Sequence, residues 1–286
     1  MKTSRTAEMK CLERAISYYE NNELLRADDN IAPVIMPSFF SGLAKLRLLK
    51  PAYRLFAPSG IYEYVVARTK YIDEAFEKNL KNVEQVLIFG AGFDSRSIRF
   101  KDKAAHTSFF ELDSPITQGA KIGRLKEKKV AVPSNVVFIP IDFDRDSLSQ
   151  KLDEHDFKRN KVCLFLLEGL TMYLDPASID ATFKLISEYA GAGSIIIFDY
   201  IYASVVRREN LYEDEKKVYE SVLKAGEKWT FGIEKGEVGA FLSEYGLTLV
   251  DEATSEVLEK RYLTDRKGRL VARVTGTHAL ATARKQ

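Results

Sequence analysis

The rhythm of hydrophobic and polar positions changes near residue 80. Before it, apolar residues recur at helical spacing and Pro33 and Pro37 interrupt the pattern, which predicts an N-terminal helical cap over residues 1–80. After it, short apolar runs alternate with amphipathic stretches. Alternating strands and helices are typical of a parallel sheet covered by helices on both faces. We therefore expect an α/β core over residues 81–286 that forms one structural unit with the cap.

Seven β-rich apolar runs are the predicted strands, at residues 85–89, 107–113, 135–142, 162–168, 193–202, 247–254 and 278–283. Helical spacing predicts helices at residues 6–23, 39–49, 62–80, 121–129, 146–153 and 176–189. The charged segment 203–228 is expected to form an exposed helix beside the mouth of the site. Ligands of open α/β sheets bind beyond the carboxyl ends of the strands, so we expect the functional residues at that edge.

The first predicted strand runs into Gly90, Ala91 and Gly92, which suit a tight turn where backbone approaches a ligand closely. A carboxylate that accepts hydrogen bonds from a ribose is expected about 20 residues later. Asp113 lies 23 residues after Gly90, and Glu111 is an alternative for the same role. An ordinary strand-end turn with solvated acids would explain each feature alone. Together, the glycine pair and the acid favour a ligand that contains a nucleoside.

Two features argue against a dinucleotide. Ser95 occupies the position of the third glycine in the G-x-G-x-x-G pattern, and the Asp94 carboxylate would repel a phosphate at the start of the following helix. A ligand with an adenine, a ribose and a cationic linker fits better. S-adenosyl-L-methionine is such a ligand, because its sulfonium tolerates nearby carboxylates. We predict it as the cofactor.

Composition narrows the function classes. The 286 residues are 45% hydrophobic, enough for a sizeable core. The 43 basic and 41 acidic residues give a net charge of +2, which provides no global field for nucleic acid or an anionic membrane. Cys11 and Cys163 lie far apart, and no Cys/His spacing suggests a metal site. We expect a cytoplasmic protein without a membrane span; nothing specifies an oligomer, and a monomer is compatible with the sequence.

Acidic residues stand at the ends of four predicted strands: Asp113, Asp142, Glu168 and Asp199. Parallel strands end at one edge of a sheet, so these carboxylates are expected together. Singly, a strand-end acid is more often a helix cap or part of a solvated turn. Glu168 stands out because it follows the apolar run 163–167, where an unpaired charge would be costly. It needs a partner, such as the amine of the cofactor.

Several motifs, in this order along nearly the whole chain, resemble the leucine carboxyl methyltransferase and polyketide O-methyltransferase family of S-adenosyl-L-methionine-dependent enzymes. The matching segments are residues 4–7, 67–73, 90–96, 110–115, 140–143, 167–174, 229–233 and 241–246. Their collinear order is far more specific than any single motif. The resemblance implies a class I methyltransferase fold, a Rossmann-like seven-stranded sheet with its last strand antiparallel.

The resemblance also implies a cofactor site, residue by residue. Arg68 would hold the methionine carboxylate and Glu168 would lie near the methionine amine. Gly90 and Gly92 would lie under the cofactor, with Ala91 between them. Asp113 would bind the ribose hydroxyls, and Asp142 and Phe143 would flank the adenine. Some relatives place a cofactor-binding lysine in the first helix, but neither Lys10 nor Cys11 aligns securely with it.

The acceptor is less well specified. Methyl transfer from a sulfonium is an in-line displacement, so a carboxylate acceptor, already ionised, needs no base, whereas a hydroxyl generally does. We place none of the three histidines, His106, His155 and His278, at the catalytic edge. Tyr173 and Tyr200 are the candidate acceptor-pocket residues, because tyrosine hydroxyls could hydrogen-bond a carboxylate. These features favour O-methylation of a carboxylate on a small-molecule, polyketide-like acceptor.

Other functions remain open at this point. Within methyltransferases, the alternative is an enzyme that acts on a protein C-terminal carboxylate. From other classes, the alternatives are a nicotinamide-dependent oxidoreductase and a cofactor-binding protein without catalysis, because a shared fold does not decide function. Trp229 and Phe231 could form a pocket wall or simply pack in the core.

Overall fold

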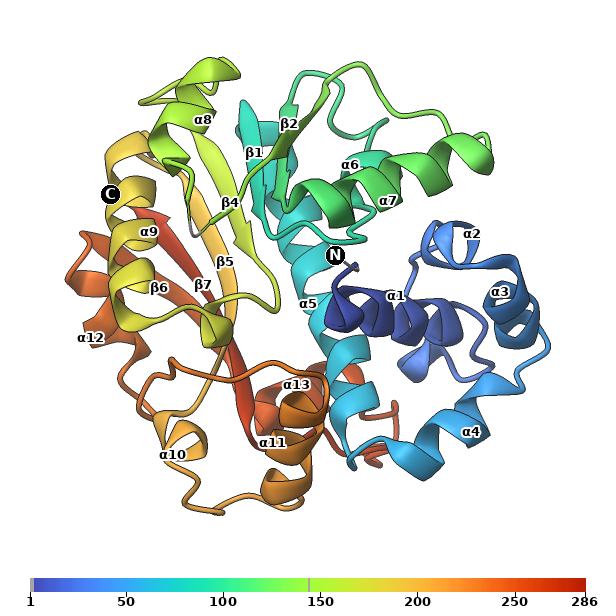
Figure 1. The fold of residues 1–286 in the computed structure, drawn as a ribbon. Coiled ribbons are helices and arrows are strands. Elements are labelled where there is room, and N and C mark those ends of the chain that lie inside the picture. Colours follow the sequence, from blue (N-terminus) through green and yellow to red (C-terminus); the bar gives the residue numbers. More distant parts are fainter. Residues whose placement is uncertain (1–2, 144) are drawn as a thin grey trace.

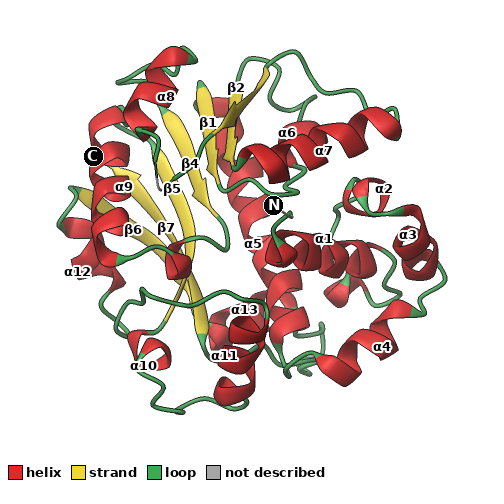
Figure 2. Ribbon diagram, in the orientation of Figure 1, coloured by secondary structure: helices red, strands yellow, loops and turns green. Residues whose placement is uncertain are grey.

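The computed structural model describes residues 3–143 and 145–286. Its centre is a seven-stranded sheet of order β3-β2-β1-β4-β5-β7-β6 (Figures 1 and 2). The strands are β1 (Gln85–Phe89), β2 (Ser108–Asp113), β3 (Val136–Pro140), β4 (Cys163–Leu167), β5 (Ile195–Ile201), β6 (Leu247–Ala253) and β7 (His278–Lys285). Strands β1 to β5 run parallel, and β7 is antiparallel to both β5 and β6. The predicted sheet is confirmed, with each predicted strand end within two residues of the observed one.

Both faces of the sheet are buried, because side chains alternate along each strand. In β1, Leu87 and Phe89 belong to one hydrophobic core, and Val86 and Ile88 belong to another. Among the described residues, five helices contribute to the first core, namely α8 (Leu148–Glu154), α9 (Pro176–Tyr189), α10 (Ala203–Val206), α11 (Glu215–Lys224) and α12 (Val238–Ser243). Two contribute to the second, namely α5 (Ile61–Asn79) and α13 (Ser255–Tyr262). Helix α5 therefore packs directly on the sheet, so cap and core share one hydrophobic interior.

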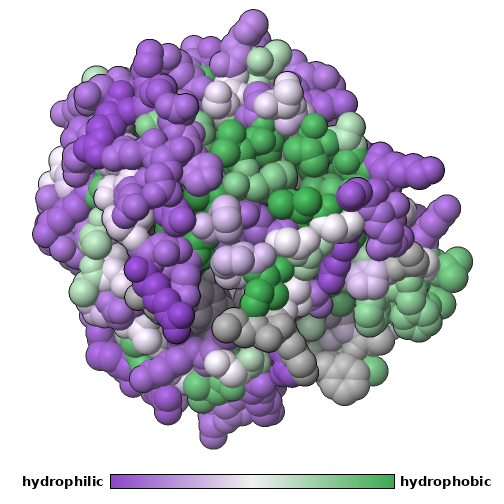
Figure 3. Space-filling model, turned by 45° about the horizontal axis from the view of Figure 1, so that its top comes forward, coloured by the Kyte–Doolittle hydropathy of each residue, from purple (hydrophilic) through white to green (hydrophobic). Residues whose placement is uncertain are grey.

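The N-terminal cap is more broken than predicted. Its helices are α1 (Arg5–Tyr18), α2 (Ala32–Ile35), α3 (Ser38–Lys45) and α4 (Leu49–Phe56), with a 3₁₀ turn at Glu23–Leu25. The predicted helix 39–49 corresponds to α3, which ends at Lys45, and α4 was not predicted; the chain breaks between them near Arg47, whose φ is 60°. Helices α3 and α4 leave Phe39, Leu46 and Leu55 exposed. An apolar surface is visible at the right edge of Figure 3, the side on which α3 lies in Figure 1.

Helix boundaries follow local capping chemistry where the sequence supplies it. Helix α9 begins as predicted at Pro176, because the Asp175 side chain accepts a hydrogen bond from Ser178 N. Helix α7 (Pro115–Glu127) begins six residues before the predicted start, behind the Ser114 cap. The single helix predicted over 203–228 is two helices, α10 (Ala203–Val206) and α11 (Glu215–Lys224). Helix α6 (Arg96–Arg99) and the 3₁₀ turns at Leu80–Asn82 and Thr171–Tyr173 were not predicted.

Within residues 3–143 and 145–286, no group of three or more His, Cys, Asp or Glu side chains is arranged to hold a metal ion. In the same part of the chain, no helix has both the length and the apolar character needed to cross a membrane.

Both cysteines are expected to be unreactive in the folded protein. Cys11 and Cys163 are fully buried, and burial raises the pKa of each thiol to about 12. Because the thiolate is the reactive form, a thiol reagent at pH 8 should modify neither residue in the native protein and both after unfolding. Rapid labelling of the native protein, measured by intact mass, would contradict this burial.

Candidate active site

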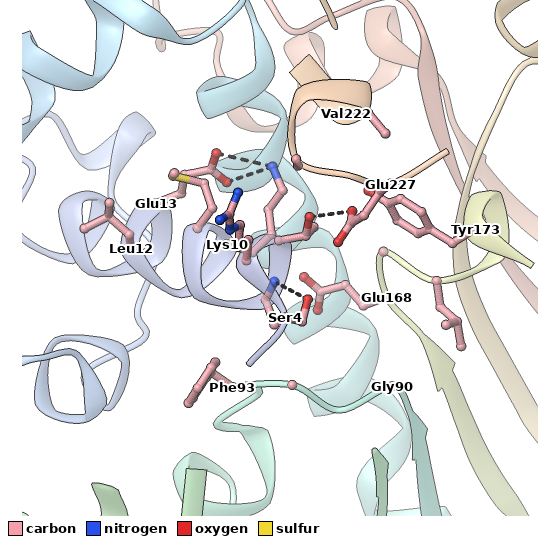
Figure 4. Close-up of a pocket in the computed structure, with 18 of the residues that line it drawn as sticks. Ser4, Lys10, Leu12, Glu13, Gly90, Phe93, Glu168, Tyr173, Val222 and Glu227 are labelled. Atoms are coloured by element: carbon pink, nitrogen blue, oxygen red, sulfur yellow. Dashed lines mark hydrogen bonds and ion pairs between the residues drawn. The ribbon is translucent and has the colours of Figure 1, made fainter. Parts of the chain in front are cut away.

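A cavity of about 830 Å³ lies at the carboxyl edge of the sheet. The glycine turn after β1 and the loop after β4 form one side of it, and helices α1, α5 and α11 form the other. Figure 4 shows Gly90, Glu168, Tyr173 and Glu227 arranged around one hollow that faces Lys10 and Glu13 of α1. The cavity therefore lies at the carboxyl edge of the strands, where the sheet topology predicted the functional residues. The segment 203–228 contributes to the lining through α11.

Most of the predicted site residues line this cavity. The residues that do so are Arg68, Gly90, Ala91, Gly92, Asp113, Phe143, Glu168 and Tyr173. Asp142 and Tyr200 are not among the lining residues. Tyr200 lies on the other side of β5, where its hydroxyl donates to Glu252 Oε1 at 2.6 Å. Asp142 lies beyond the end of β3, where its Oδ2 is 3.7 Å from Arg145 Nε. The expectation that Tyr200 lines an acceptor pocket is therefore not met by this structure.

The turn after β1 requires its glycines. Gly90 and Gly92 have φ values of 57° and 50°, in the left-handed region. A Cβ atom on Gly92 would lie 3.1 Å from the Ala7 side chain, so the turn also brings α1 close. Asp113 Oδ2 accepts a hydrogen bond from Gly92 N at 2.5 Å, and its Oδ1 accepts one from Ser114 N at 2.6 Å. The predicted glycine turn and the predicted acid, Asp113, are thus joined by a direct hydrogen bond.

A buried ion cluster forms the floor of the cavity. Arg68 Nη1 lies 2.6 Å from Asp199 Oδ2, and Arg68 Nη2 lies 3.0 Å from Glu168 Oε1. Asp199 also accepts hydrogen bonds from the Tyr64 hydroxyl and Gly169 N. Burial alone would raise the pKa of Glu168, but Arg96 and Arg68 hold it well below its usual value. Glu168 therefore has two arginine partners within the protein, and Asp199 is an internal partner of Arg68 and does not line the cavity.

Arg96 completes this cluster and was not assigned a role from the sequence. It is 2% exposed and contacts three carboxylates. Its Nη1 lies 2.6 Å from Glu168 Oε2 and 2.5 Å from Asp94 Oδ2, and its Nε lies 2.7 Å from Asp73 Oδ1. Asp94, which the sequence suggested as a repulsive charge, is therefore neutralised by Arg96. Asp94 is two positions from Arg96, but Asp73 and Glu168 are 23 and 72 positions away, and no local signal reveals those two contacts.

The cavity carries a slight excess of negative charge. Its lining contains five acids, Glu13, Asp94, Asp113, Glu168 and Glu227, and four bases, Arg5, Lys10, Arg14 and Arg68. Three buried polar atoms of the ion cluster make no hydrogen bond to the described residues: Arg68 Nε, Arg96 Nη2 and Glu168 Oε1. Arg68 and Glu168 line the cavity and Arg96 does not, and Glu168 Oε1 has its ion-pair contact with Arg68 Nη2 at 3.0 Å. A ligand with a net positive charge matches the electrostatics.

Helix α1 contributes more to the cavity than the sequence indicated. Lys10, which was not assigned to the site, lines the cavity and pairs with Glu13 at 3.0 Å. Glu13 also accepts a short hydrogen bond from the Tyr53 hydroxyl. Arg14 pairs with Asp29 at 2.9 Å and donates to the Phe93 carbonyl at 2.7 Å. The charged groups of Lys10 and Arg14 are therefore already engaged by acids or a carbonyl oxygen.

Aromatic side chains close the far end of the cavity. Tyr173 and Trp229 both line it, whereas Phe231 packs against the hydrophobic core. Burial, with the Glu227 charge, raises the pKa of the Tyr173 phenol and keeps it neutral at physiological pH. Tyr173 thus lies in the loop after β4, as predicted, and lines the cavity.

His278 corrects the prediction that no histidine reaches this edge. It lines the cavity as the first residue of β7 and pairs in register with Ile201, the last residue of β5. An antiparallel strand begins where its parallel neighbours end, so β7 delivers its first side chain to the carboxyl edge. His278 was predicted in the last strand, and the antiparallel direction of that strand is the signal that could have placed it at this edge.

Comparison with known proteins adds the following findings. The sequence profile of the leucine carboxyl methyltransferase family matches residues 7–187. The chain is 24% identical over 208 residues to the "Putative S-adenosyl-L-methionine-dependent methyltransferase YktD" of Bacillus subtilis, covering 72% of this chain and 68% of that protein. It is 29% identical over 211 residues to a Mycobacteroides abscessus protein of the same description, covering 70% and 67%.

Solved structures share the fold. A crystal structure titled a putative methyltransferase from Thermobifida fusca matches all of this chain and 96% of its own, with a TM-score of 0.59 and 14% identity. An O-methyltransferase family protein from Burkholderia thailandensis matches 79% of this chain and 58% of its own, with a TM-score of 0.50 and 10% identity. At such low identities the likeness concerns the fold alone. It agrees with the class I methyltransferase topology read from the strand order.

Proposed function

The chain belongs to the leucine carboxyl methyltransferase family of S-adenosyl-L-methionine-dependent methyltransferases, and we propose that it transfers a methyl group to an oxygen atom of a small, largely apolar acceptor. The observation that carries this proposal is the division of the cavity. One part holds the glycine turn, Asp113 and the ion cluster, and the other is lined mainly by apolar and aromatic side chains.

The polar part fits S-adenosyl-L-methionine. With its ammonium, sulfonium and carboxylate, the cofactor has a net charge of +1, opposite to the one-charge excess of acid in the lining. Glu168 lines the cavity and its carboxylate suits an ammonium, and Arg68 Nε, which makes no hydrogen bond to the described residues, suits a carboxylate. Asp113 would accept from the ribose hydroxyls beside the glycine turn. Phe143, on the same rim, would cover one face of the adenine, with Asp142 next to it in sequence.

The apolar part fits the acceptor. Leu12, Ile16, Leu49, Ile61, Val222 and Trp229 line it, and Tyr173 borders it. Burial of apolar surface would bind a hydrophobic ring system or chain without any ion pair. A protein C-terminus is the alternative acceptor, but its backbone N–H and C=O groups would find few partners on such a wall. We therefore favour a small-molecule acceptor.

The proposed mechanism relies on positioning. When bound, the cofactor supplies an electrophilic methyl group on sulfur. The ion cluster holds the ligand-facing atoms of Arg68 and Glu168 in fixed positions, because each side chain also has a buried protein partner. Trp229 and the apolar wall exclude water from the acceptor oxygen. The chain thus orients two reactants, and no covalent intermediate is required.

Calorimetry with S-adenosyl-L-methionine and S-adenosylhomocysteine tests this proposal. We expect micromolar binding that weakens at least tenfold in Asp113→Ala and is unchanged in Asp156→Ala, an exposed aspartate far from the glycine turn in sequence. NAD should not compete, whereas competition would favour an oxidoreductase. A folded protein that binds neither compound would refute the assignment, and binding without methyl transfer to any acceptor would favour a non-catalytic cofactor-binding protein.

A further inference from the structure

His278 is the least explained polar group in the cavity. The side chain is 6% exposed and lies between two aromatic rings, 4.6 Å from Tyr64 and 5.3 Å from Trp229 between ring centroids. Its Nδ1 lies 2.7 Å from Thr277 Oγ1. Among the described residues, Nε2 has no hydrogen-bond partner. An imidazole held by one nitrogen, with the other free at a cavity, is arranged to meet a ligand.

The surroundings of His278 keep its ring neutral. Burial lowers its pKa well below the usual value, and the positive charges of Lys10 and Arg68 add to that effect. Tyr64, which faces it from α5, stays a neutral phenol because burial and Asp199 raise its pKa. A neutral imidazole has one nitrogen that donates and one that accepts. Thr277 Oγ1 lies 2.8 Å from Thr275 Oγ1. The Thr277 hydroxyl can therefore accept a hydrogen bond from His278 Nδ1–H and donate its own hydrogen to Thr275 Oγ1. With the ring proton on Nδ1, Nε2 carries a lone pair.

The charges of the cavity disfavour a carboxylate acceptor. Each buried base in the lining already has an acidic partner: Lys10 has Glu13, Arg14 has Asp29, and Arg68 has Asp199 and Glu168. Arg5 lies on the exposed rim. Glu227 adds a further negative charge beside Tyr173. A buried carboxylate without a cation is costly, whereas a neutral hydroxyl needs only a group that accepts its proton.

We propose that His278 is the general base of this enzyme and that the acceptor is a hydroxyl group, phenolic or enolic, on an apolar body. This inference rests on the proposed function and names its substrate class. The hydroxyl proton passes to Nε2, and an oxygen lone pair forms the bond to the methyl carbon. The carbon–sulfur bond breaks with its electron pair staying on sulfur, which gives an ether and S-adenosylhomocysteine. The imidazolium then returns its proton to solvent. Thr277 is a positioning residue.

The hydroxyl replaces the carboxylate that the sequence favoured. That expectation depended on no histidine reaching the catalytic edge, and His278 does reach it. The two acceptors place opposite demands on this residue. A carboxylate would use Nε2–H as a hydrogen-bond donor, and a hydroxyl requires an Nε2 lone pair. The tautomer of His278 therefore distinguishes them.

The first test does not depend on knowing the acceptor. The chain has three histidines, so ¹⁵N-detected imidazole spectra are simple, and His278→Gln assigns the resonance of interest. We expect a neutral ring with the proton on Nδ1, unchanged from pH 8 to about pH 6, a range that brackets the ordinary titration of histidine. An imidazolium at pH 7, or a proton on Nε2, would overturn the proposal.

The second test uses 2-naphthol and 2-naphthoic acid, which share an apolar body and differ in the reacting group. With labelled S-adenosyl-L-methionine, we expect the naphthol to be methylated. His278→Gln, which keeps polar contacts but has no basic nitrogen, should lower kcat at least about 100-fold. Added imidazole should partly restore His278→Ala. Methylation of the acid alone, or a His278→Gln rate within threefold of wild type, would contradict a base role.

Two controls separate this inference from the proposed function. His106→Gln replaces an exposed histidine at the far end of β2 and should keep the wild-type rate. Binding of S-adenosylhomocysteine to His278→Gln should stay within threefold of wild type, because the cofactor contacts lie elsewhere. If the wild type itself fails to bind that compound, the proposed function fails and the base assignment fails with it. If binding is intact and only the tautomer is wrong, the base assignment alone fails.

Discussion

Arg68→Met is expected to lower the free energy of unfolding by about 3–5 kcal/mol, the usual cost of breaking a buried ion pair from one side. The change leaves Asp199, which is fully buried, with only the Tyr64 hydroxyl and Gly169 N as partners. It also removes one of the two arginines that hold Glu168. A buried charge that loses its counter-charge cannot recover the loss from solvent.

Urea unfolding at pH 7, followed by circular dichroism, measures this effect. Arg207→Met is the matched control, because Arg207 makes its ion pairs with Glu209 and Glu234 at the exposed surface. Its stability should stay close to wild type. The double variant Arg68→Met/Asp199→Asn should be more stable than Arg68→Met alone, since it removes the unpaired charge. Equal stability of Arg68→Met and Arg207→Met would show that the cluster contributes nothing.

This cluster connects the fold to the function. Arg68 comes from α5, Glu168 follows β4, Asp199 lies in β5 and Arg96 begins α6. The Arg68–Asp199 pair therefore ties α5 to the sheet, and the Arg96–Glu168 pair fixes the loop after β4 to the start of α6, which follows the glycine turn. Of these four side chains, Arg68 and Glu168 also line the cavity. The edge of the sheet that carries the cavity is thus also held by these ion pairs, and α5 packs on the sheet within the same hydrophobic core.

The fold was largely predictable because its signals are local. The parallel strands β1, β2, β4 and β5 are largely buried on both faces and appear as short, continuous apolar runs, and all five parallel strands were placed within two residues. Proline and a capping aspartate set the start of α9. The short helices α6 and α10 were not resolved, because four residues contain too little periodicity to recognise. The break between α3 and α4 was not predicted, because position 47 is an arginine and not a proline or glycine, which would signal a break.

The site was predictable only where its residues are close in sequence or fixed by register. The glycine turn and Asp113 belong to one strand–turn–strand unit, so spacing alone paired them. Arg68 and Asp199 are 131 positions apart, and no single-sequence pattern pairs them. Tyr200 was misplaced because neighbouring residues in a strand face opposite ways, and Asp199 takes the side toward α5. His278 could have been found, since an antiparallel last strand must begin at the catalytic edge.

Glu168→Gln is expected to cost about 3 kcal/mol at pH 7, and the cost should shrink in acid. Arg96 and Arg68 hold the pKa of Glu168 below its usual value of about 4.3 in the folded state. A depressed folded pKa contributes stability that is fully present above the unfolded pKa and is lost as the pH falls toward the folded pKa. The difference between wild type and variant should therefore be constant from pH 7 to about 5 and diminish below about 4.

Unfolding curves at a series of pH values distinguish this ion pair from simple packing. Glutamine has nearly the same shape as glutamate, so a packing effect would be independent of pH, and a difference that persists unchanged to pH 3 would contradict the electrostatic origin. Glu77→Gln, at an exposed ion pair with Lys103, should match wild type at every pH. Because Glu168 also faces the cavity, its loss of charge should weaken S-adenosyl-L-methionine binding at pH 7, where wild type and variant are both folded. Stability and cofactor affinity would then depend on the same carboxylate, as expected if one buried cluster both stabilises the sheet edge and forms the binding site.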